Sequence, residues 1–379
     1  MENKKILFLS GTRADFGKLK SLITISQKSK TFDTSIFVTG MHLQKKYGYT
    51  VNEIKKSDFK NIYKFENQTE ETSMDLTLSK TIQGLSVYVK QNKPDLIIVH
   101  GDRVEALAGA IVGSLNNILV GHIEGGEVSG TIDELIRHSV TKMSHIHFVS
   151  NMEAKTRLIQ MGELESNIFE IGSPDIDIML STKLPSIEKA KNRYEIPFKK
   201  YAIFMFHPVT TETEHIEKQA NELVNAVLED ESNYIVIYPN NDMGSSDIIK
   251  AISRLENNKR FRIFPSLRFE YFLTFLKNCQ FIIGNSSAGI REAPYYQKAS
   301  IDLGSRQKNR AKNKSIISCE FDKTEILNAI KHSQNLSDFE SPSDFGQGKS
   351  DQLFYKIISK KSFWKINCQK SFKDHKLAK

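Results

Sequence analysis

The chain of 379 residues is 39% hydrophobic and 26% charged, and its 53 basic and 45 acidic residues give a formal net charge of +8. This composition excludes a disordered chain, and the length favours two globular domains over one. A membrane span needs roughly 20 apolar residues and a secretory signal needs a longer apolar run than the N-terminus offers, so we expect a cytoplasmic protein.

The first half of the chain alternates short apolar runs with amphipathic segments. The apolar runs, which are typical of buried strands, are residues 4–10, 34–40, 94–102, 117–124, 145–150 and 168–174. Residues 16–29 and 77–92 lie between them and have apolar positions three and four apart, as amphipathic helices do. This alternation predicts an α/β domain whose parallel sheet is covered by helices on both faces.

The pattern is interrupted after residue 172 and then restarts. Two prolines and a polar helical segment interrupt the strands, so we expect a linker near residues 172–185. The strand-like runs that follow are residues 199–210, 232–242, 261–266, 279–287 and 298–306. We therefore predict two doubly wound, Rossmann-like domains, residues 1–175 and 176–355, with a ligand cleft between their strand ends.

Neither the cysteines nor the excess of basic residues indicates a zinc-binding, disulfide-rich or nucleic-acid-binding protein. Cys279, Cys319 and Cys368 are far apart and lack CxxC spacing, which argues against a zinc site or a disulfide framework. Much of the basic excess lies in residues 306–314 and 360–379, without a nucleic-acid recognition motif. We expect no nucleic-acid partner; the charge suits a solvated surface or an anionic small-molecule ligand.

Residues 284–294, GNSSAGIREAP, follow an apolar run and place small residues where a helix would begin. Backbone N–H groups, the hydroxyls of Ser286 and Ser287 and the helix dipole would converge there on a phosphate or diphosphate. Glu292, on the same predicted helix, would then lie near a ribose. An ordinary serine-capped helix start is the simpler alternative.

Other side chains that could bind an anion follow other predicted strands. Arg13 could reach an anionic group, and Asp15 beside it could instead cap a helix. Arg306 could bind a phosphate through two of its N–H groups. His207, at the end of its strand, could donate to a phosphate oxygen or move a proton, and a histidine bonded to backbone is an equally good interpretation.

Carboxylates gather near two predicted strand ends of the first domain. Asp102 ends one strand, and the stretch HIEGGEVSGTIDELIRH that follows the next contains Glu124, Glu127, Asp133 and Glu134. Because strand ends of a parallel sheet meet at one ligand crevice, Asp102 is a candidate base with Arg103 near an anion, and Glu124 and Asp133 fall at or just after the same strand ends. Three carboxylates could instead hold magnesium, but no DxD pair or histidine–carboxylate spacing is present. Glu127 and Glu134 are interpreted as a loop charge and a first-turn helix charge.

Six segments, in chain order, closely resemble the hydrolysing UDP-N-acetylglucosamine 2-epimerases, which make N-acetylmannosamine for sialic acid synthesis. They are GDRVEALAGAIVG, HIEGGEVSGTIDELIRHSVTKMSHIH, GSPDID, HPVTTE, GNSSAGIREAP and LGSRQKNR, and the resemblance spans roughly residues 4–320. It implies a glycosyltransferase-B type fold in which a C-terminal helix or tail, residues 356–379, packs back on the first domain. It also implies a UDP-linked N-acetylhexosamine substrate, no redox cofactor and no required metal.

The same resemblance implies which residues act. The acid and base residues correspond to Asp102, Glu124 and Asp133, with His207 beside them. The substrate- and nucleotide-binding candidates are Arg13, His42, Arg103, Asn240, Leu267, Ser286, Ser287, Gly289, Glu292 and Arg306. In the expected reaction UDP leaves, the C2 proton is removed to form a glycal, and water then adds to it.

Several alternatives stay open at the sequence level. Relatives with the same signature act on a 2,4-diacetamido-trideoxy sugar joined to UDP or GDP, on the route to legionaminic acid, and PNNDMG, PSLRFEYF and WKINCQKSFKD resemble that branch at least as much. A glycosyltransferase of the same fold would also use the diphosphate site but would leave the carboxylates unexplained. A non-hydrolysing epimerase that keeps the nucleotide and a nucleotide-sugar sensor without chemistry are further alternatives. We expect a homodimer or homotetramer.

Overall fold

The computed structural model describes residues 3–68, 73–129, 132–181, 184–308, 313–336, 339 and 345–374, and the structural statements below concern these. The chain divides into two compact units. The first comprises Met1–Glu127, Asp133–Thr182 and Ser343–Lys379, and the second comprises Val128–Ile132 and Lys183–Pro342. The sequence placed the domain boundaries at residues 175 and 355, whereas contacts separate the units near residues 182 and 343.

The first unit contains a seven-stranded parallel sheet in the order β3-β2-β1-β4-β5-β6-β7. Its strands are β1 (Lys4–Ser10), β2 (Phe32–Val38), β3 (Asn61–Lys64), β4 (Leu96–His100), β5 (Leu119–Ile123), β6 (Ile146–Val149) and β7 (Ile168–Glu170). The strands β1 and β4 to β6 are almost wholly buried, which is the pattern of a sheet covered on both faces. The strand order reverses between β1 and β4, the position where doubly wound folds bind ligands.

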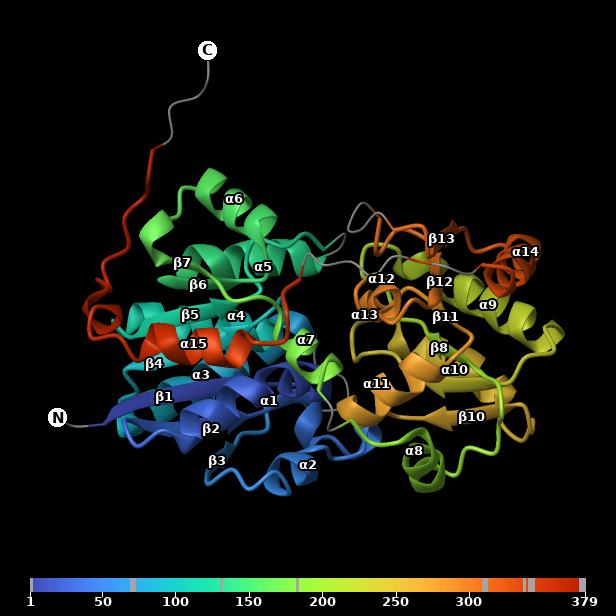
Figure 1. Cartoon of the computed structure of the whole chain (residues 1–379), viewed down its shortest axis with the longest axis horizontal. Helices are drawn as coiled ribbons and strands as arrows, with labels where there is room; N and C mark the ends of the chain where they lie inside the picture. The colour runs from blue at the N-terminus through green and yellow to red at the C-terminus, as the bar shows by residue number, and fades with distance from the viewer. Residues whose placement is uncertain are drawn as a thin grey trace, which may run out of the picture. The chain divides into compact units, whose positions relative to one another are not determined.

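Helices of the first unit connect these strands and cover the sheet (Figure 1). They are α1 (Arg13–Lys28), α2 (Val51–Lys55), α3 (Met74–Asn92), α4 (Val104–Leu115), α5 (Ile132–Met143), α6 (Met152–Gln160) and α7 (Pro174–Met179). The helix α1 begins at a capping box in which Thr12 accepts from the Asp15 backbone and Asp15 accepts from the Thr12 backbone. None of the helices in the described residues has the length and apolar character needed to cross a membrane.

The C-terminal helix α15 (Ser350–Ile358) belongs to the first unit, where it packs beside α1 and α7 (Figure 1). Phe354 is fully buried, with its ring centroid 4.9 Å from that of Phe148 on β6 and 6.3 Å from that of Phe8 on β1. The expected boundary at residue 355 falls inside this helix. The whole helix belongs to the first unit because Phe354 and Ile358 are part of that unit's hydrophobic core.

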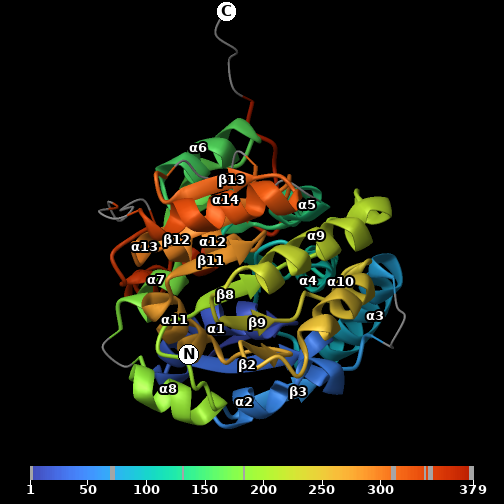
Figure 2. The same ribbon diagram turned by 90° about the vertical axis from the view of Figure 1, so that its right-hand side faces the viewer.

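The second unit contains a six-stranded parallel sheet in the order β10-β9-β8-β11-β12-β13. Its strands are β8 (Ala202–Met205), β9 (Tyr234–Ile237), β10 (Phe261–Phe264), β11 (Phe281–Gly284), β12 (Ala299–Leu303) and β13 (Ile316–Cys319). Its helices are α8 (Ile187–Tyr194), α9 (Ile216–Glu229), α10 (Ser245–Ile252), α11 (Phe269–Asn278), α12 (Ser287–Ile290), α13 (Glu292–Tyr295) and α14 (Lys323–Gln334). Figure 2 shows α9, α10 and α14 side by side over this sheet, and the strand order reverses between β8 and β11.

The predicted fold class is confirmed, since each unit is a doubly wound parallel α/β structure. The sequence reading missed β3 and β13, which are the outermost strands of their sheets. Neither strand contains a fully buried residue, so neither shows the apolar run that marked the central strands.

Candidate active site

The candidate residues of the first unit lie at the carboxyl edge of its sheet. Asp102 follows β4 by two residues, and Glu124 follows β5 directly. Asp133 is the second residue of α5, the helix that leads from β5 to β6. The sheet therefore places Asp102 and Glu124 at neighbouring strand ends, as the sequence predicted, and the next helix brings Asp133 into the same connection.

Arg137 on α5 connects two of these carboxylate residues. Its Nη1 donates to the backbone carbonyl of Glu124 at 2.7 Å, and its Nη2 donates to the carboxylate of Asp102. The Arg137 residue is only 3% exposed, so its charge is held where Asp102 can neutralise it. The sequence reading did not single out Arg137; it lies four residues after Asp133, a spacing that places both on one side of a helix.

The carboxylate of Glu124 is 2% exposed and is surrounded by donors from other segments. Ser173 donates to Oε1 at 2.5 Å, and His100 Nε2 lies 3.1 Å from Oε2. The Lys18 ammonium lies 3.8 Å from the same Oε2 and 2.8 Å from Asp175. These contacts favour the ionised form of Glu124, because the buried negative charge has a cation and hydrogen-bond donors beside it.

The backbone of Glu124 is also unusual. Its φ is +63°, in the left-handed region that side chains other than glycine rarely adopt. Its N–H donates to the carbonyl of Phe148 at 3.0 Å, and its own carbonyl accepts from Arg137. Surrounding hydrogen bonds thus hold a costly conformation, a feature that concentrates at functional sites.

His42, which the resemblance predicts to be a substrate-binding residue, lies in the interior with 0% exposure. Its Nδ1 lies 2.6 Å from the Thr50 hydroxyl, and its Nε2 lies 3.0 Å from the Ser10 hydroxyl. Burial, and then the positive charge of Arg13, lower the pKa of His42 to about 3. We therefore interpret His42 as a neutral support for the loop that carries Arg13.

The two arginines predicted to meet an anion begin helices of this unit. Arg13 is the first residue of α1, and Arg103 is the N-cap of α4. Arg103 Nε lies 3.9 Å from the buried carboxylate of Glu105. Asp15 takes the capping role that the sequence left open for it, and burial is the main cause that raises its pKa.

In the second unit, Asn285 joins three strand-end loops. This residue follows β11 and is 0% exposed. Its Oδ1 accepts from the backbone N–H of His207 at 2.7 Å, and its Nδ2 donates to the carbonyl of His207 at 2.9 Å. Its own carbonyl accepts from Arg306 Nη1 at 3.2 Å and from Gln307 Nε2 at 2.9 Å. Asn285 was not singled out from the sequence, yet it fixes His207 and Arg306 at the carboxyl edge of one sheet.

The hydrogen bonds of His207 set its tautomer. Its Nδ1 accepts from the backbone N–H of Asn240 at 3.0 Å, so the hydrogen of the neutral ring is on Nε2. The side chain of Asn240 in turn donates to Asp242 at 2.5 Å. His207 can therefore offer an N–H donor from Nε2, which is the role that a phosphate oxygen requires.

The predicted helix after Ser286 is broken into two. Ser286 caps α12 and accepts from the N–H of Ala288 at 3.3 Å, but α12 ends at Ile290 and Glu292 begins the separate helix α13. The expectation that Glu292 lies on the same helix is wrong. The cause is Pro294, which has no N–H to donate to the Ile290 carbonyl and whose ring would clash with it.

The remaining candidates of the second unit are close-packed. Ser287 is the first residue of α12, and Gly289 is buried within it, where an added Cβ would lie 2.5 Å from the hydroxyl of Ser300. Glu292 is 4% exposed, and Leu267, just before α11, is 6% exposed. Within the described ranges, no group of three or more His, Cys, Asp or Glu side chains is placed to hold a metal ion.

Residues 25–359 match the family described as UDP-N-acetylglucosamine 2-epimerase. The chain belongs to the UDP-N-acetylglucosamine 2-epimerase family. This 2-epimerase family member is 46% identical over 374 residues to the UDP-N-acetylglucosamine 2-epimerase of Neisseria meningitidis, covering 98% of this chain and 99% of that one.

A second relative carries a different substrate in its name. It is the UDP-N,N'-diacetylbacillosamine 2-epimerase (hydrolyzing) of Legionella pneumophila, 34% identical over 94% of this epimerase-family chain and 95% of its own. Among solved structures, the Methanocaldococcus jannaschii UDP-GlcNAc 2-epimerase in complex with UDP-GlcNAc and UDP superposes with a TM-score of 0.80, at 22% identity, over 94% of this chain and 99% of that chain. That likeness agrees with the fold of both units.

Proposed function

We propose that this protein is a hydrolysing UDP-N-acetylglucosamine 2-epimerase, which converts its substrate to N-acetylmannosamine and UDP. The observation that carries the proposal is Arg137, which holds the carboxylate of Asp102 and the backbone of Glu124 in one hydrogen-bonded unit. Family membership supplies the substrate class, and the name of the Legionella relative supports a hydrolysing reaction.

The chemistry explains why such residues are needed. The hydrogen at C2 of an N-acetylhexosamine is not acidic until positive charge develops at C1, and departure of UDP produces that charge. The C1–O bond breaks with its electron pair going to UDP, and a carboxylate removes the C2 proton to leave a glycal. Water then adds at C1 while a proton is delivered to the opposite face of C2, which gives N-acetylmannosamine.

The first unit offers the proton-transfer groups. Glu124 has Lys18, His100 and Ser173 beside its carboxylate, so it is available as an ionised base. Asp102 is held by Arg137 in a fixed orientation, and we assign it and Asp133 to proton transfer beside Glu124. Burial strengthens each of these electrostatic interactions, because little water screens them.

The second unit offers the groups for the leaving nucleotide. His207 with a hydrogen on Nε2 and Arg306 are both hydrogen-bonded to Asn285, and the Ser286 hydroxyl follows Asn285 directly in the chain. Donors fixed in this way stabilise the negative charge that builds on a departing diphosphate, because they need no reorganisation during the reaction.

Proton NMR of purified protein with UDP-N-acetylglucosamine in D₂O tests the proposal. We expect free N-acetylmannosamine carrying deuterium at C2, together with UDP. An epimerised sugar that keeps its UDP would instead identify a non-hydrolysing enzyme and overturn the hydrolysing reaction.

The second candidate substrate is UDP-N,N'-diacetylbacillosamine, which is supported by the 34% identical relative named for it. Parallel reactions with both UDP-sugars compare kcat/KM directly. We expect higher kcat/KM with UDP-N-acetylglucosamine, since the Neisseria relative is more similar to this chain. A tenfold preference for the diacetamido sugar would reassign the substrate.

A further inference from the structure

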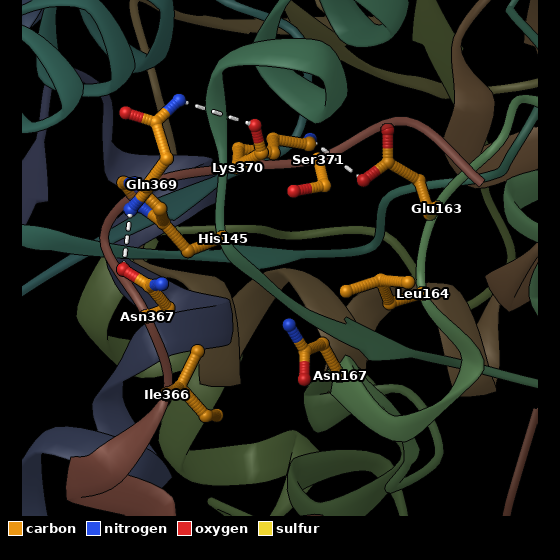
Figure 3. Close-up of a pocket in the computed structure, with 9 residues that line it drawn as sticks. All are labelled: His145, Glu163, Leu164, Asn167, Ile366, Asn367, Gln369, Lys370 and Ser371. Carbon is orange, nitrogen blue, oxygen red and sulfur yellow. Dashed lines mark hydrogen bonds and ion pairs between the residues drawn. The ribbon is translucent and has the colours of Figure 1, made fainter.

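The last described segment of the chain, residues 366–374, runs across the first unit at the C-terminal end of α5. It forms one side of a pocket of about 140 Å³ that is lined on the other side by His145, Glu163, Leu164 and Asn167. Figure 3 shows Lys370 of this segment directed toward Glu163. The proposed chemistry uses none of these residues, which raises the question of what they do.

Lys370 caps the helix α5. Its ammonium donates to the backbone carbonyl of Ser144 at 2.7 Å and to that of Thr141 at 2.9 Å, and it lies 2.6 Å from the carboxylate of Glu163. These three partners use all three N–H groups of the ammonium. The helix α5 ends at Met143, so a positive charge stands where the helix dipole is negative and where carbonyls lack partners within the helix.

Glu163 is the buried carboxylate that pairs with Lys370. Its side chain is 2% exposed, and it also accepts from Lys142 at 2.7 Å and from His147 Nε2 at 3.0 Å. Burial opposes its ionisation, but the hydrogen bond and charge of His147, with Lys142 and Lys370, lower the pKa of Glu163 to about 2. The carboxylate is therefore a permanent negative charge at neutral pH, ready to hold the Lys370 ammonium.

The rest of the segment is fixed on both sides of Lys370. Before it, the carbonyl of Cys368 accepts from His145 Nε2 at 2.9 Å. After it, the Phe372 ring covers Gly162, where an added Cβ would lie 2.5 Å from the ring, and Lys373 N–H donates to the carbonyl of Gly162 at 3.0 Å. Contacts on both sides of Lys370 thus fix the backbone of this segment and place the Lys370 side chain beside α5.

The capped helix is the one that carries Arg137. Thr141, whose carbonyl Lys370 binds, lies one turn after Arg137 on α5. The hydroxyl of Thr141 lies 3.1 Å from His122 Nδ1, and His122 Nε2 lies 2.8 Å from the carbonyl of Gly101, next to Asp102. The C-terminal end of α5 is therefore linked both to Lys370 and to the loop that holds Asp102.

We propose that Lys370 is a positioning residue, which fixes α5 so that Arg137 holds Asp102 and Glu124 in their reactive arrangement. As a statement about catalysis the proposal rests on the proposed function, while its structural part, the capping of α5, does not. A displacement of about 1 Å in a catalytic group can lower a rate by about 100-fold, so loss of the cap should reduce turnover more than substrate binding.

The test compares Lys370→Met with Lys373→Met in the full-length protein. Lys373 is exposed and contacts Gly162 through its backbone N–H rather than its side chain, so it controls for lost charge in this region. We expect amide hydrogen exchange at the C-terminal turn of α5 to become roughly tenfold faster in Lys370→Met and to stay unchanged in Lys373→Met. We also expect kcat to fall roughly tenfold in Lys370→Met with little change in KM or in the Kd for UDP.

Lys370→Arg provides the rescue and guards against a variant that fails to fold. It keeps the positive charge and should recover part of kcat and of the exchange protection, which a general loss of stability would not predict. Unchanged exchange at α5 in folded Lys370→Met would overturn the cap, and faster exchange with unchanged kcat would overturn the positioning role. Failure of the wild-type protein to consume either UDP-sugar would refute the proposed function but leave the exchange comparison decisive for the cap.

Discussion

The guanidinium of Arg137 donates to the carboxylate of Asp102, while its second terminal nitrogen donates to the backbone carbonyl of Glu124 at 2.7 Å. Two separate nitrogens of one planar group make these contacts, whereas a lysine would have to reach both acceptors from a single nitrogen. The arginine joins the loops after β4 and β5. The positions of the two predicted proton-transfer residues, Asp102 and Glu124, therefore depend on α5, the helix that carries Arg137.

Replacement of Arg137 by lysine should separate these loops. The single ammonium would keep the charge but lose one of the two directed contacts, so we expect kcat to fall roughly 100-fold. The Kd for UDP, measured by calorimetry, should change less than threefold, since Arg137 is not among the residues assigned to the nucleotide. Arg254→Lys is the matched control, because Arg254 also makes two directed contacts, but to the exposed side chains of Asn221 and Asn225. Equal loss of kcat in both variants would refute the special role of Arg137.

Amide replacements test the carboxylates themselves. Glu124→Gln and Asp102→Asn keep side-chain shape but cannot take up a proton, so each should lower kcat by about 100-fold or more while UDP still binds. Glu134→Gln, on the first turn of the same helix as Asp133, should keep near wild-type turnover. Single-turnover NMR distinguishes the variants, and full activity of Glu124→Gln would remove Glu124 from the mechanism.

The sequence predicted the residues that the sheet alone positions, and it missed those that depend on packing. Asp102 and Glu124 follow buried strands, and the carboxyl ends of neighbouring parallel strands lie close together however the connecting helices pack. Arg137 could not be paired from sequence, because its partners depend on how α5 is rotated against two loops. His42 has the residue type of a ligand contact, and only its burial shows that hydroxyls occupy both ring nitrogens. The break before Glu292, in contrast, was signalled by Pro294.

Asn285 offers a test in the second unit. Asn285→Ala would leave the part-buried N–H and carbonyl of His207 without their side-chain partner, so we expect a loss of about 1 kcal/mol or more in the free energy of unfolding. The Kd for UDP should rise roughly tenfold, because the His207 backbone would lose both contacts to the Asn285 side chain, while the Asn285 carbonyl that accepts from Arg306 would remain. Asn335→Ala on the exposed end of α14 serves as the control for both measurements. Unchanged UDP affinity in a folded Asn285→Ala protein would contradict the assignment of these loops to the nucleotide.

The buried His42 should make the protein sensitive to mild acid. Burial and the charge of Arg13 lower its folded-state pKa from about 6.5 to about 3, so below pH 6.5 the unfolded chain binds a proton at this residue that the folded protein does not. Stability must then fall as the pH falls from 6.5 toward 3, by up to about 1.4 kcal/mol per pH unit from this residue. Asp15, whose carboxylate lies 3.9 Å from His42 Nε2, has a raised pKa, so the folded protein binds a proton there more readily than the unfolded chain does. Protonation of Asp15 therefore offsets part of the stability that His42 loses in acid.

Urea unfolding between pH 7 and pH 4.5 measures this effect as a slope. His42→Gln should be less stable than wild type at pH 7, because the glutamine amide cannot reproduce both ring contacts, but its stability should decline less steeply with acid. The difference between the two proteins should therefore shrink as the pH falls. His215→Gln, at an exposed histidine, should give the wild-type slope. Parallel wild-type and His42→Gln slopes would mean that His42 has the same pKa in the folded and unfolded protein. That result would contradict the lowering of its pKa by burial.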